Sequence, residues 1–251
     1  MTIDWLFFRD NGPVFAFTAG RGVADALNPY SGFNCCGYVG DDPVNVARCR
    51  HELCSRIGIP TTALLTVRQV HGTDVVTVTS AGHPLGEADA LVTNLQNVAI
   101  GVFTADCVPM LFYDRQSRTI GAAHAGWKGT MNGIAVRTIE AMLALGATAG
   151  NLQALFGPSI CRDCFEVGDE VVEMFRSRGL PIEKLAVRNP ATGKAHIDLA
   201  EANAFWMRQC GLKDENIVRT NLCTKCNPTR YYSARNLGTA SGRNLTALLL
   251  A

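Results

Sequence analysis

Residues 98–125 read VAIGVFTADCVPMLFYDRQSRTIGAAHA, and this stretch decides the fold. It contains three apolar segments of strand length, 98–103, 108–113 and 119–124, each bounded by Gly, Pro or charged residues. Such segments are typical of strands that are buried in a sheet. Cys107 lies between the first two segments, and His124 closes the third. The sequence therefore predicts both residues at points where strands pass into loops.

Helices and further strands are predicted around this stretch. Residues 61–70 and 74–79 are rich in Thr, Val and Leu, and we expect them to form strands on either side of His71. Apolar residues recur at helical spacing between start and stop signals in four segments, which predicts helices at 43–57, 130–145, 167–178 and 199–210. These elements follow one another without a regular βαβ rhythm. We therefore expect an α+β fold with mixed sheets, not a doubly wound parallel sheet.

Two of these helices have clear boundaries. Asp42 as N-cap and Pro43 at the first helical position start one, and Gly58 ends it. The helix at 199–210 follows Asp198, and Glu201 three residues later resembles a capping box, while Gly211 supplies a left-handed terminus.

Length, charge and composition limit the classes of protein. The chain has 251 residues, of which 47% are hydrophobic, and shows no repeat or linker, so we expect a single catalytic domain over 1–251. Its 23 Lys and Arg against 22 Asp and Glu create no net field that favours nucleic acid or an anionic membrane. No segment resembles a signal peptide or membrane span, which predicts a cytoplasmic protein with reduced thiols. The oligomeric state stays open between monomer and homodimer.

His71, Cys107 and His124 are the candidate metal ligands. Only five histidines are present, and two of them lie in Gly-flanked strand ends near a cysteine with polar neighbours. Two imidazoles and one thiolate suit zinc and leave the fourth tetrahedral position open for chemistry. Their spacing follows no local ligand motif, so only the fold can unite them, and each could equally be a packed residue without a metal.

Two CxxC pairs, Cys161 with Cys164 and Cys223 with Cys226, are further candidates for a metal site. Compact zinc ribbons separate such pairs by about 15–20 residues, and this gap is far longer. We therefore expect independent reduced thiols, with a four-cysteine zinc site as the alternative. Neither pair precedes a convincing thioredoxin-like βαβ unit, which argues against a redox role.

Charged and polar residues border the candidate ligands. Arg68 and Gln69 precede His71, and Lys128 follows His124 by four residues, so positive charge suited to phosphate is expected there. Four carboxylates are candidates to move protons, although each is more often structural: Asp74, Asp89, Asp106 and Glu166.

Six blocks, in this order, carry a family resemblance: RQVHGTDV, EADALVT, TADCVPMLFYD, GAAHAGWKGT, FGPSICRDCFEVG and YYSARNLGTASGR. Together they resemble the polyphenol-oxidase or laccase-domain family, of the YfiH-like, purine nucleoside phosphorylase type. The resemblance implies a central β-sandwich flanked by helices. It also implies zinc ligands at the His of QVHG, the Cys of TADC and the His of AHAGW, which are His71, Cys107 and His124.

The resemblance further implies phosphorolysis of adenosine, inosine and methylthioadenosine, together with deamination of adenosine. It also implies a disputed phenol oxidation, for which Cu²⁺ would replace zinc as the bound ion. On this basis we expect Arg68 to act beside the three metal ligands, and Gln69, Lys128 and Asp89 to contact substrate. Four positions depart from the usual family pattern and leave substrate preference open: Tyr38, Cys49, Lys128 and Phe165.

The residue types alone also permit functions other than the one that the resemblance implies. A multicopper oxidase needs many imidazoles, commonly in His-x-His pairs, and five histidines without such a pair argue against it. Cys107 activated by His124 could instead serve a cysteine hydrolase or deamidase. A nucleoside-binding or scaffold protein with a structural zinc is the non-catalytic alternative.

Overall fold

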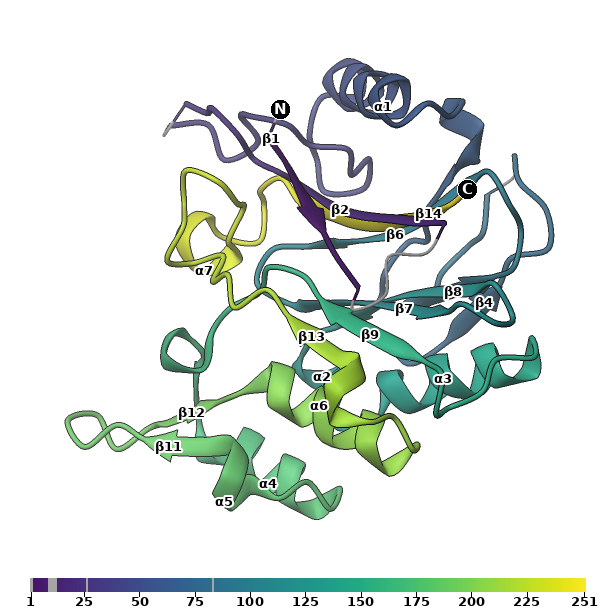
Figure 1. The fold of residues 1–251 in the computed structure, drawn as a ribbon. Helices are drawn as coiled ribbons and strands as arrows, with labels where there is room; N and C mark the ends of the chain where they lie inside the picture. The colour runs from purple at the N-terminus through teal and green to yellow at the C-terminus, as the bar shows by residue number, and fades with distance from the viewer. Residues whose placement is uncertain (1, 9–12, 26, 83) are drawn as a thin grey trace.

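The computed structural model describes residues 2–8, 13–25, 27–82 and 84–251, and its strands form two large sheets and one small one (Figure 1). The five-stranded sheet has the order β1 (Thr2–Leu6), β2 (Val14–Gly20), β14 (Asn244–Leu250), β6 (Val98–Thr104), β3 (Leu64–Leu65). The six-stranded sheet has the order β13 (Ile217–Arg219), β9 (Gln153–Phe156), β7 (Val108–Asp114), β8 (Thr119–Ala125), β5 (Ala90–Thr93), β4 (Val75–Thr77). The three-stranded sheet has the order β10 (Glu166–Val167), β12 (Ala195–Ile197), β11 (Ala186–Arg188).

The helices are α1 (Pro43–Ile57), α2 (Trp127–Met131), α3 (Ile134–Ala144), α4 (Asp169–Ser177), α5 (Ile182–Leu185), α6 (Leu199–Gln209) and α7 (Ala234–Leu237). Short 3-10 turns occupy Thr61–Ala63, Arg162–Cys164 and Asp214–Asn216. Both large sheets are mixed, because β3 with β6, β4 with β5, and β9 with β13 pair in parallel while their other pairs are antiparallel. The α+β prediction with mixed sheets is confirmed.

The two large sheets pack face to face, with helices on both outer sides (Figure 1). Ile100 and Leu248 of one sheet and Leu111 of the other belong to the apolar cluster between them. Helix α1 covers the outer face of the five-stranded sheet, where Leu53 packs with Phe17. Helices α3 and α6 cover the outer face of the six-stranded sheet. The result is a β-sandwich between helical layers, as the family resemblance implied.

This layering explains the apolar runs in residues 98–125. Strands β6, β7 and β8 are buried along their whole lengths. In β7, Leu111 points into the layer between the sheets, whereas its neighbour Phe112 packs with the helices. Strands covered on both faces need apolar residues on both faces, so the usual alternation with polar residues disappears.

The predicted helices form, with one break. Asp42 accepts a hydrogen bond from the amide of Val44, and Gly58 ends α1 in the left-handed conformation at φ 75°. The single helix predicted over 130–145 is divided into α2 and α3, because Gly133 adopts φ 80° between them. A left-handed residue interrupts the helical path and turns the chain.

Helix α6 has half of the predicted capping box. The Asp198 side chain accepts from the Glu201 amide at 2.8 Å, as expected. The Glu201 carboxylate does not reach back to the helix start, because it forms ion pairs with Arg208 and Arg219 instead. The side chain therefore ties α6 to β13.

The strand predicted over 61–70 was largely wrong. Only Leu64–Leu65 form a strand, after the 3-10 turn. Farther along, the Gln69 side chain takes the place of backbone pairing with β6. Its amide nitrogen donates to the Phe103 carbonyl and its amide oxygen accepts from the Phe103 N–H, both at 2.7 Å. This exchange leaves the backbone free to turn toward His71.

In the part of the chain that the structure describes, no helix is long and apolar enough to cross a membrane.

Candidate metal centre

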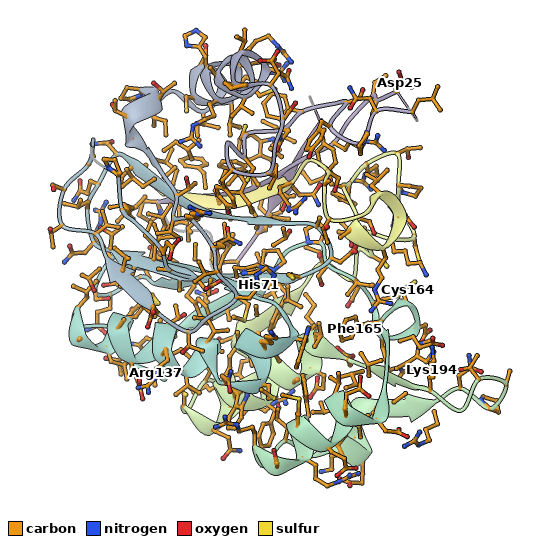
Figure 2. The ribbon with its side chains drawn as sticks, turned by 180° about the vertical axis from the view of Figure 1, so that it is seen from behind. Asp25, His71, Arg137, Cys164, Phe165 and Lys194 are labelled. Carbon is orange, nitrogen blue, oxygen red and sulfur yellow. The ribbon has the colours of Figure 1, made fainter. Side chains whose placement is uncertain are left out.

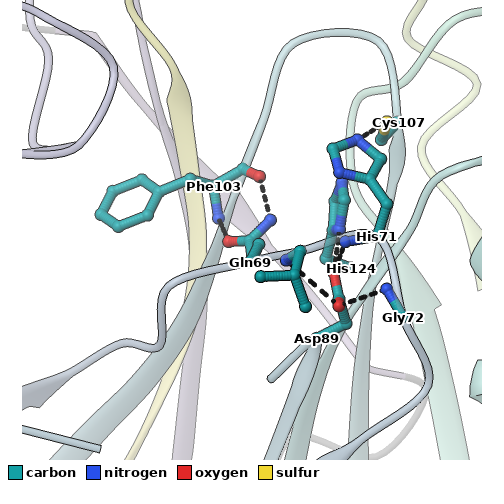
Figure 3. Close-up of polar contacts among 8 residues, drawn as sticks. Gln69, His71, Gly72, Asp89, Phe103, Cys107 and His124 are labelled. Atoms are coloured by element: carbon teal, nitrogen blue, oxygen red, sulfur yellow. Dashed lines mark hydrogen bonds and ion pairs between the residues drawn. The ribbon is translucent and has the colours of Figure 1, made fainter. Parts of the chain in front are cut away.

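The fold brings His71, Cys107 and His124 together. One donor atom from each lies within 4.8 Å of the others. His71 comes from the loop between β3 and β4, Cys107 from the turn between β6 and β7, and His124 from β8 (Figure 3). The Cys107 sulfur is 4.0 Å from His71 Nε2, and the two imidazole rings are 4.7 Å apart at an interplanar angle of 89°. The donor atoms thus converge on one point.

Asp89 holds two of these residues in place. Its carboxylate is fully buried and lies 2.7 Å from His124 Nδ1. The same carboxylate accepts from the backbone N–H groups of His71 at 3.0 Å and Gly72 at 2.6 Å. His71 itself adopts φ 61°, a conformation that a non-glycine residue keeps only when its surroundings fix it. Asp89 supplies that restraint (Figure 3).

The charges of the cluster are coupled. Desolvation favours the neutral Cys107 thiol, but the charge of His124 and hydrogen bonds from His124 and His71 outweigh it and lower the pKa of Cys107 to about 6. Desolvation likewise opposes the charged form of His124, but the Cys107 thiolate and the Asp89 carboxylate raise the pKa of His124 to about 9. The site therefore favours a thiolate beside a cation.

The donor set fits a zinc ion. A thiolate and two imidazoles are suitable ligands, and three protein ligands leave one tetrahedral position open. The bond from Asp89 occupies Nδ1 of His124 and leaves Nε2 for the ion, which is the usual arrangement of a carboxylate behind a ligating histidine. His71 is exposed, so the cluster opens to solution.

Gly126 allows the cluster to close. A Cβ at this position would lie 2.9 Å from Cδ2 of His71 and 3.3 Å from the Cys107 sulfur. Any side chain would therefore push against two of the three donors. Gly126 stands two residues after His124 in AHAGW, and its contact with His71 and Cys107 arises only in the folded chain.

Two of the residues expected to contact substrate, Asp89 and Gln69, use their side chains to bond other parts of the protein. Asp89 lies behind the histidines and has no exposed surface, so its side chain is not accessible to a substrate. The side-chain amide of Gln69 forms hydrogen bonds to Phe103 through both its nitrogen and its oxygen. Asp89 directly precedes the buried strand Ala90–Thr93, but the sequence does not distinguish it from Glu87, which is exposed.

The two cations keep accessible side chains. Arg68 lies 3.7 Å from Glu87 and is 68% exposed. Lys128 is exposed, and its ammonium group lies 5.5 Å from the centre of the Trp127 ring. Both belong to segments that carry a metal-ligand candidate.

Asp106, one of the four candidate carboxylates, has the structural position that such residues more often have. Its carboxylate accepts from the Thr224 hydroxyl at 2.7 Å and from the Arg235 N–H at 2.8 Å, and its carbonyl accepts from the Ile160 N–H at 2.9 Å. With φ 90°, it fixes the turn that presents Cys107. Of the other two carboxylates considered, Asp74 is exposed and Glu166 pairs with Lys194.

The four remaining CxxC cysteines do not lie apart as expected. The sulfur atoms of Cys161, Cys164, Cys223 and Cys226 all lie within 4.8 Å of one another. The expectation of independent thiols was wrong, because two loops separated by 62 residues in sequence meet at this place.

The class that fold and site define is an α+β protein with a mixed β-sandwich and a solvent-accessible cluster of two histidines and one cysteine that could hold a metal ion. Residues 14–251 match the family model described as multi-copper polyphenol oxidoreductase laccase, and the chain belongs to this family.

Relatives and a solved structure agree with this assignment. The chain is 45% identical over 244 residues to adenosine deaminase RL5 from an unknown prokaryotic organism, covering 94% of this chain and 93% of that protein. It is 41% identical over 199 residues to a purine nucleoside phosphorylase of Deinococcus radiodurans, covering 79% and 76%. The crystal structure of the hypothetical protein YfiH of Bacillus licheniformis superposes with a TM-score of 0.87 at 26% identity, covering 95% and 93%.

Proposed function

We propose that the protein is a zinc-dependent purine nucleoside phosphorylase that acts on adenosine, inosine and methylthioadenosine and also deaminates adenosine. The observation that carries the proposal is the convergence of His71, Cys107 and His124 in a chain whose relatives bear the names adenosine deaminase and purine nucleoside phosphorylase. The open coordination position distinguishes this donor set from a closed structural site.

The protein's own residues prepare this site. Zinc held there supplies a Lewis acid toward water and polar substrate atoms. Asp89 fixes the orientation and tautomer of His124 through the bond at 2.7 Å. Cys107 contributes a thiolate, whose negative charge offsets part of the charge of the ion.

Phosphorolysis requires an anion site beside the ribose. A phosphate oxygen forms a bond to the anomeric carbon while the bond from that carbon to the purine nitrogen breaks, and the base takes up a proton as it leaves. Arg68 and Lys128 are accessible cations suited to hold the phosphate. Arg68 also lines an open groove of about 430 Å³ together with the exposed Tyr38, whose ring offers apolar surface to a base.

Deamination uses the same nucleoside with water as the second reactant. The water oxygen forms a bond to C6 of adenine, and the exocyclic amino group leaves as ammonia, which yields inosine. The exposed edge of the cluster at His71 gives water access to the donors.

The test is a product assay of zinc-replete protein. Inosine should give hypoxanthine and ribose 1-phosphate only when phosphate is added, and adenosine should give inosine and ammonia without phosphate. His71→Ala should lose both activities. Cys210→Ser changes a thiol at the C-terminal end of α6, outside the cluster, and is the matched control. Absence of ribose 1-phosphate from all three nucleosides would remove the phosphorylase proposal.

A second candidate rests on the line of Cys107, His124 and Asp89. A thiolate with a pKa of about 6, beside an imidazole that a carboxylate orients, is also the arrangement of a thiol hydrolase or deamidase. Such a mechanism gives His71 no task, although its Nε2 lies 4.0 Å from the sulfur. Metal analysis with thiol alkylation separates the two. Protection of Cys107 until a chelator is added favours the metal enzyme, whereas rapid alkylation of metal-free protein favours the thiol mechanism.

Copper-dependent phenol oxidation finds less support, despite the description of the family. A multicopper centre needs more imidazoles than the two in this cluster, and the whole chain has five histidines. A single Cu²⁺ bound by the same three donors remains the alternative ion, and activity of copper-loaded protein against zinc-loaded protein on a phenol tests it.

A further inference from the structure

The second group of cysteines is built from two loops that the fold joins. Cys161 precedes the 3-10 turn after β9 and Cys164 ends it, whereas Cys223 and Cys226 belong to the loop after β13. A bridge between Ser159 and Cys223 holds the loops side by side. Its bonds run from the Ser159 N–H to the Leu222 carbonyl and from the Thr224 N–H to the Ser159 carbonyl, both at 3.1 Å. The meeting of the two pairs is therefore fixed by backbone contacts.

The distances between the sulfur atoms suit a shared ion. Four thiolates around zinc, each at about 2.3 Å, stand about 3.8 Å apart at the corners of a tetrahedron. The sulfurs of Cys164 and Cys226 are 3.5 Å apart, and all four lie within 4.8 Å of one another. A disulfide would place two of them at about 2.05 Å. All four thiols are free in this structure.

A backbone contact also favours thiolate at this place. The Cys161 N–H donates to the Cys223 sulfur at 3.4 Å. An amide that points at sulfur stabilises negative charge on it, and sulfurs that ligate zinc are thiolates. Four negative sulfurs this close together need a cation between them, since like charges at such separation repel.

We propose that Cys161, Cys164, Cys223 and Cys226 bind a second zinc ion, separate from the one at His71. Four protein ligands fill the tetrahedral shell and leave no position for water or substrate, so this site is structural.

The position of the second site gives it a task in the molecule. Thr224 lies between its cysteines, and its hydroxyl donates to Asp106 at 2.7 Å. Ile160, beside Cys161, donates its N–H to the Asp106 carbonyl. Asp106 precedes Cys107, so the four-cysteine site holds the turn that presents a ligand of the first metal. Figure 2 shows Cys164 and Phe165 below α7, where Arg235 lies over the Phe165 ring at 5.3 Å.

The experiment counts metal in the full chain purified under reducing conditions. Wild-type protein should hold two zinc ions, and His71→Ala with Cys107→Ser should keep one. The double variant C164S/C226S should also keep one and should unfold at a temperature lower by about 5–10 °C. Cys210→Ser, outside both clusters, should keep two. One zinc in wild type that is lost with His71 and Cys107, or unchanged metal content in C164S/C226S, would overturn the proposal.

A second measurement holds even where C164S/C226S fails to fold. Native wild-type protein is alkylated with and without a chelator, and the modified cysteines are mapped by mass spectrometry. The four cysteines should be protected together and become reactive together when metal is removed. Iron in place of zinc, a disulfide between Cys164 and Cys226 in the purified protein, or alkylation of Cys226 at the same rate with and without the chelator would each overturn it.

Discussion

Replacement of Asp89 by Asn tests how the first metal site is held. The carboxylate accepts from His124 Nδ1 and from the amides of His71, Gly72 and Val70, at 2.7, 3.0, 2.6 and 3.3 Å. An amide nitrogen in place of one oxygen would face two of these N–H donors. Loss of a buried charged partner lowers the free energy of unfolding by about 3–5 kcal/mol. Loss of the carboxylate behind a ligating histidine lowers metal affinity about 10- to 100-fold.

The assay has two parts. Urea unfolding, followed by circular dichroism, gives the change in the free energy of unfolding. Competition with a chromophoric chelator gives zinc affinity, and His71→Ala supplies the baseline for metal bound elsewhere. Asp74→Asn is the matched control, because Asp74 lies in the loop that carries His71 and has an exposed side chain. A folded Asp89→Asn protein with zinc affinity within about threefold of wild type would refute the role given to this carboxylate.

Three further predictions concern residues around the site. Gly126→Ala should lower zinc affinity at least about tenfold by displacing His71, while Gly150→Ala, whose Cβ would meet nothing within 4 Å, should leave it unchanged in the same chelator competition. Gln69→Ala removes both bonds to β6 and should cost about 1–3 kcal/mol in urea unfolding; a loss below about 0.5 kcal/mol would contradict the pairing described. Glu201→Gln should lower stability at neutral pH by about 1–2 kcal/mol. Desolvation raises the pKa of Glu201, but its two arginine partners outweigh this and hold it below the usual 4.5, so the stabilisation is complete above that pH and is lost as pH falls below it. A difference between the Glu201→Gln and wild-type proteins that stays constant into acid would contradict this pairing.

The sheets and helices were predictable where local signals agree with burial. Residues 98–125 read as three strands because both faces of each strand are covered, and the caps Asp42 and Asp198 form as their sequence context indicates. The strand predicted over 61–70 was largely wrong because Gln69 pairs with β6 through its side chain, and composition does not indicate that a side chain will replace backbone pairing. The continuous helix over 130–145 failed for a different reason, since one left-handed glycine divides it.

The three candidate metal ligands could be selected from the sequence by residue type, but the family resemblance was needed to prefer a shared metal over three separately packed residues. Their spacing in the chain is too long for a local pattern, and the fold supplies the convergence. The same limit applied to the four cysteines, whose two loops meet through backbone bonds around Ser159 that no spacing rule contains. Asp89 was chosen as a polar residue near the site, but its direction, toward the histidines and away from solvent, depends on packing.

The place of β14 has a consequence for how the molecule forms. This strand lies between β2 and β6, so the five-stranded sheet cannot be completed until residues 244–250 have left the ribosome. Until then, β2 and β6 of the nascent chain have their central edges unpaired, and unpaired edges invite association with other chains. Pairing across such a long sequence separation is slow. We therefore expect the five-stranded sheet to be completed only after β14 is synthesised, while β7 and β8, joined by a short turn, already pair.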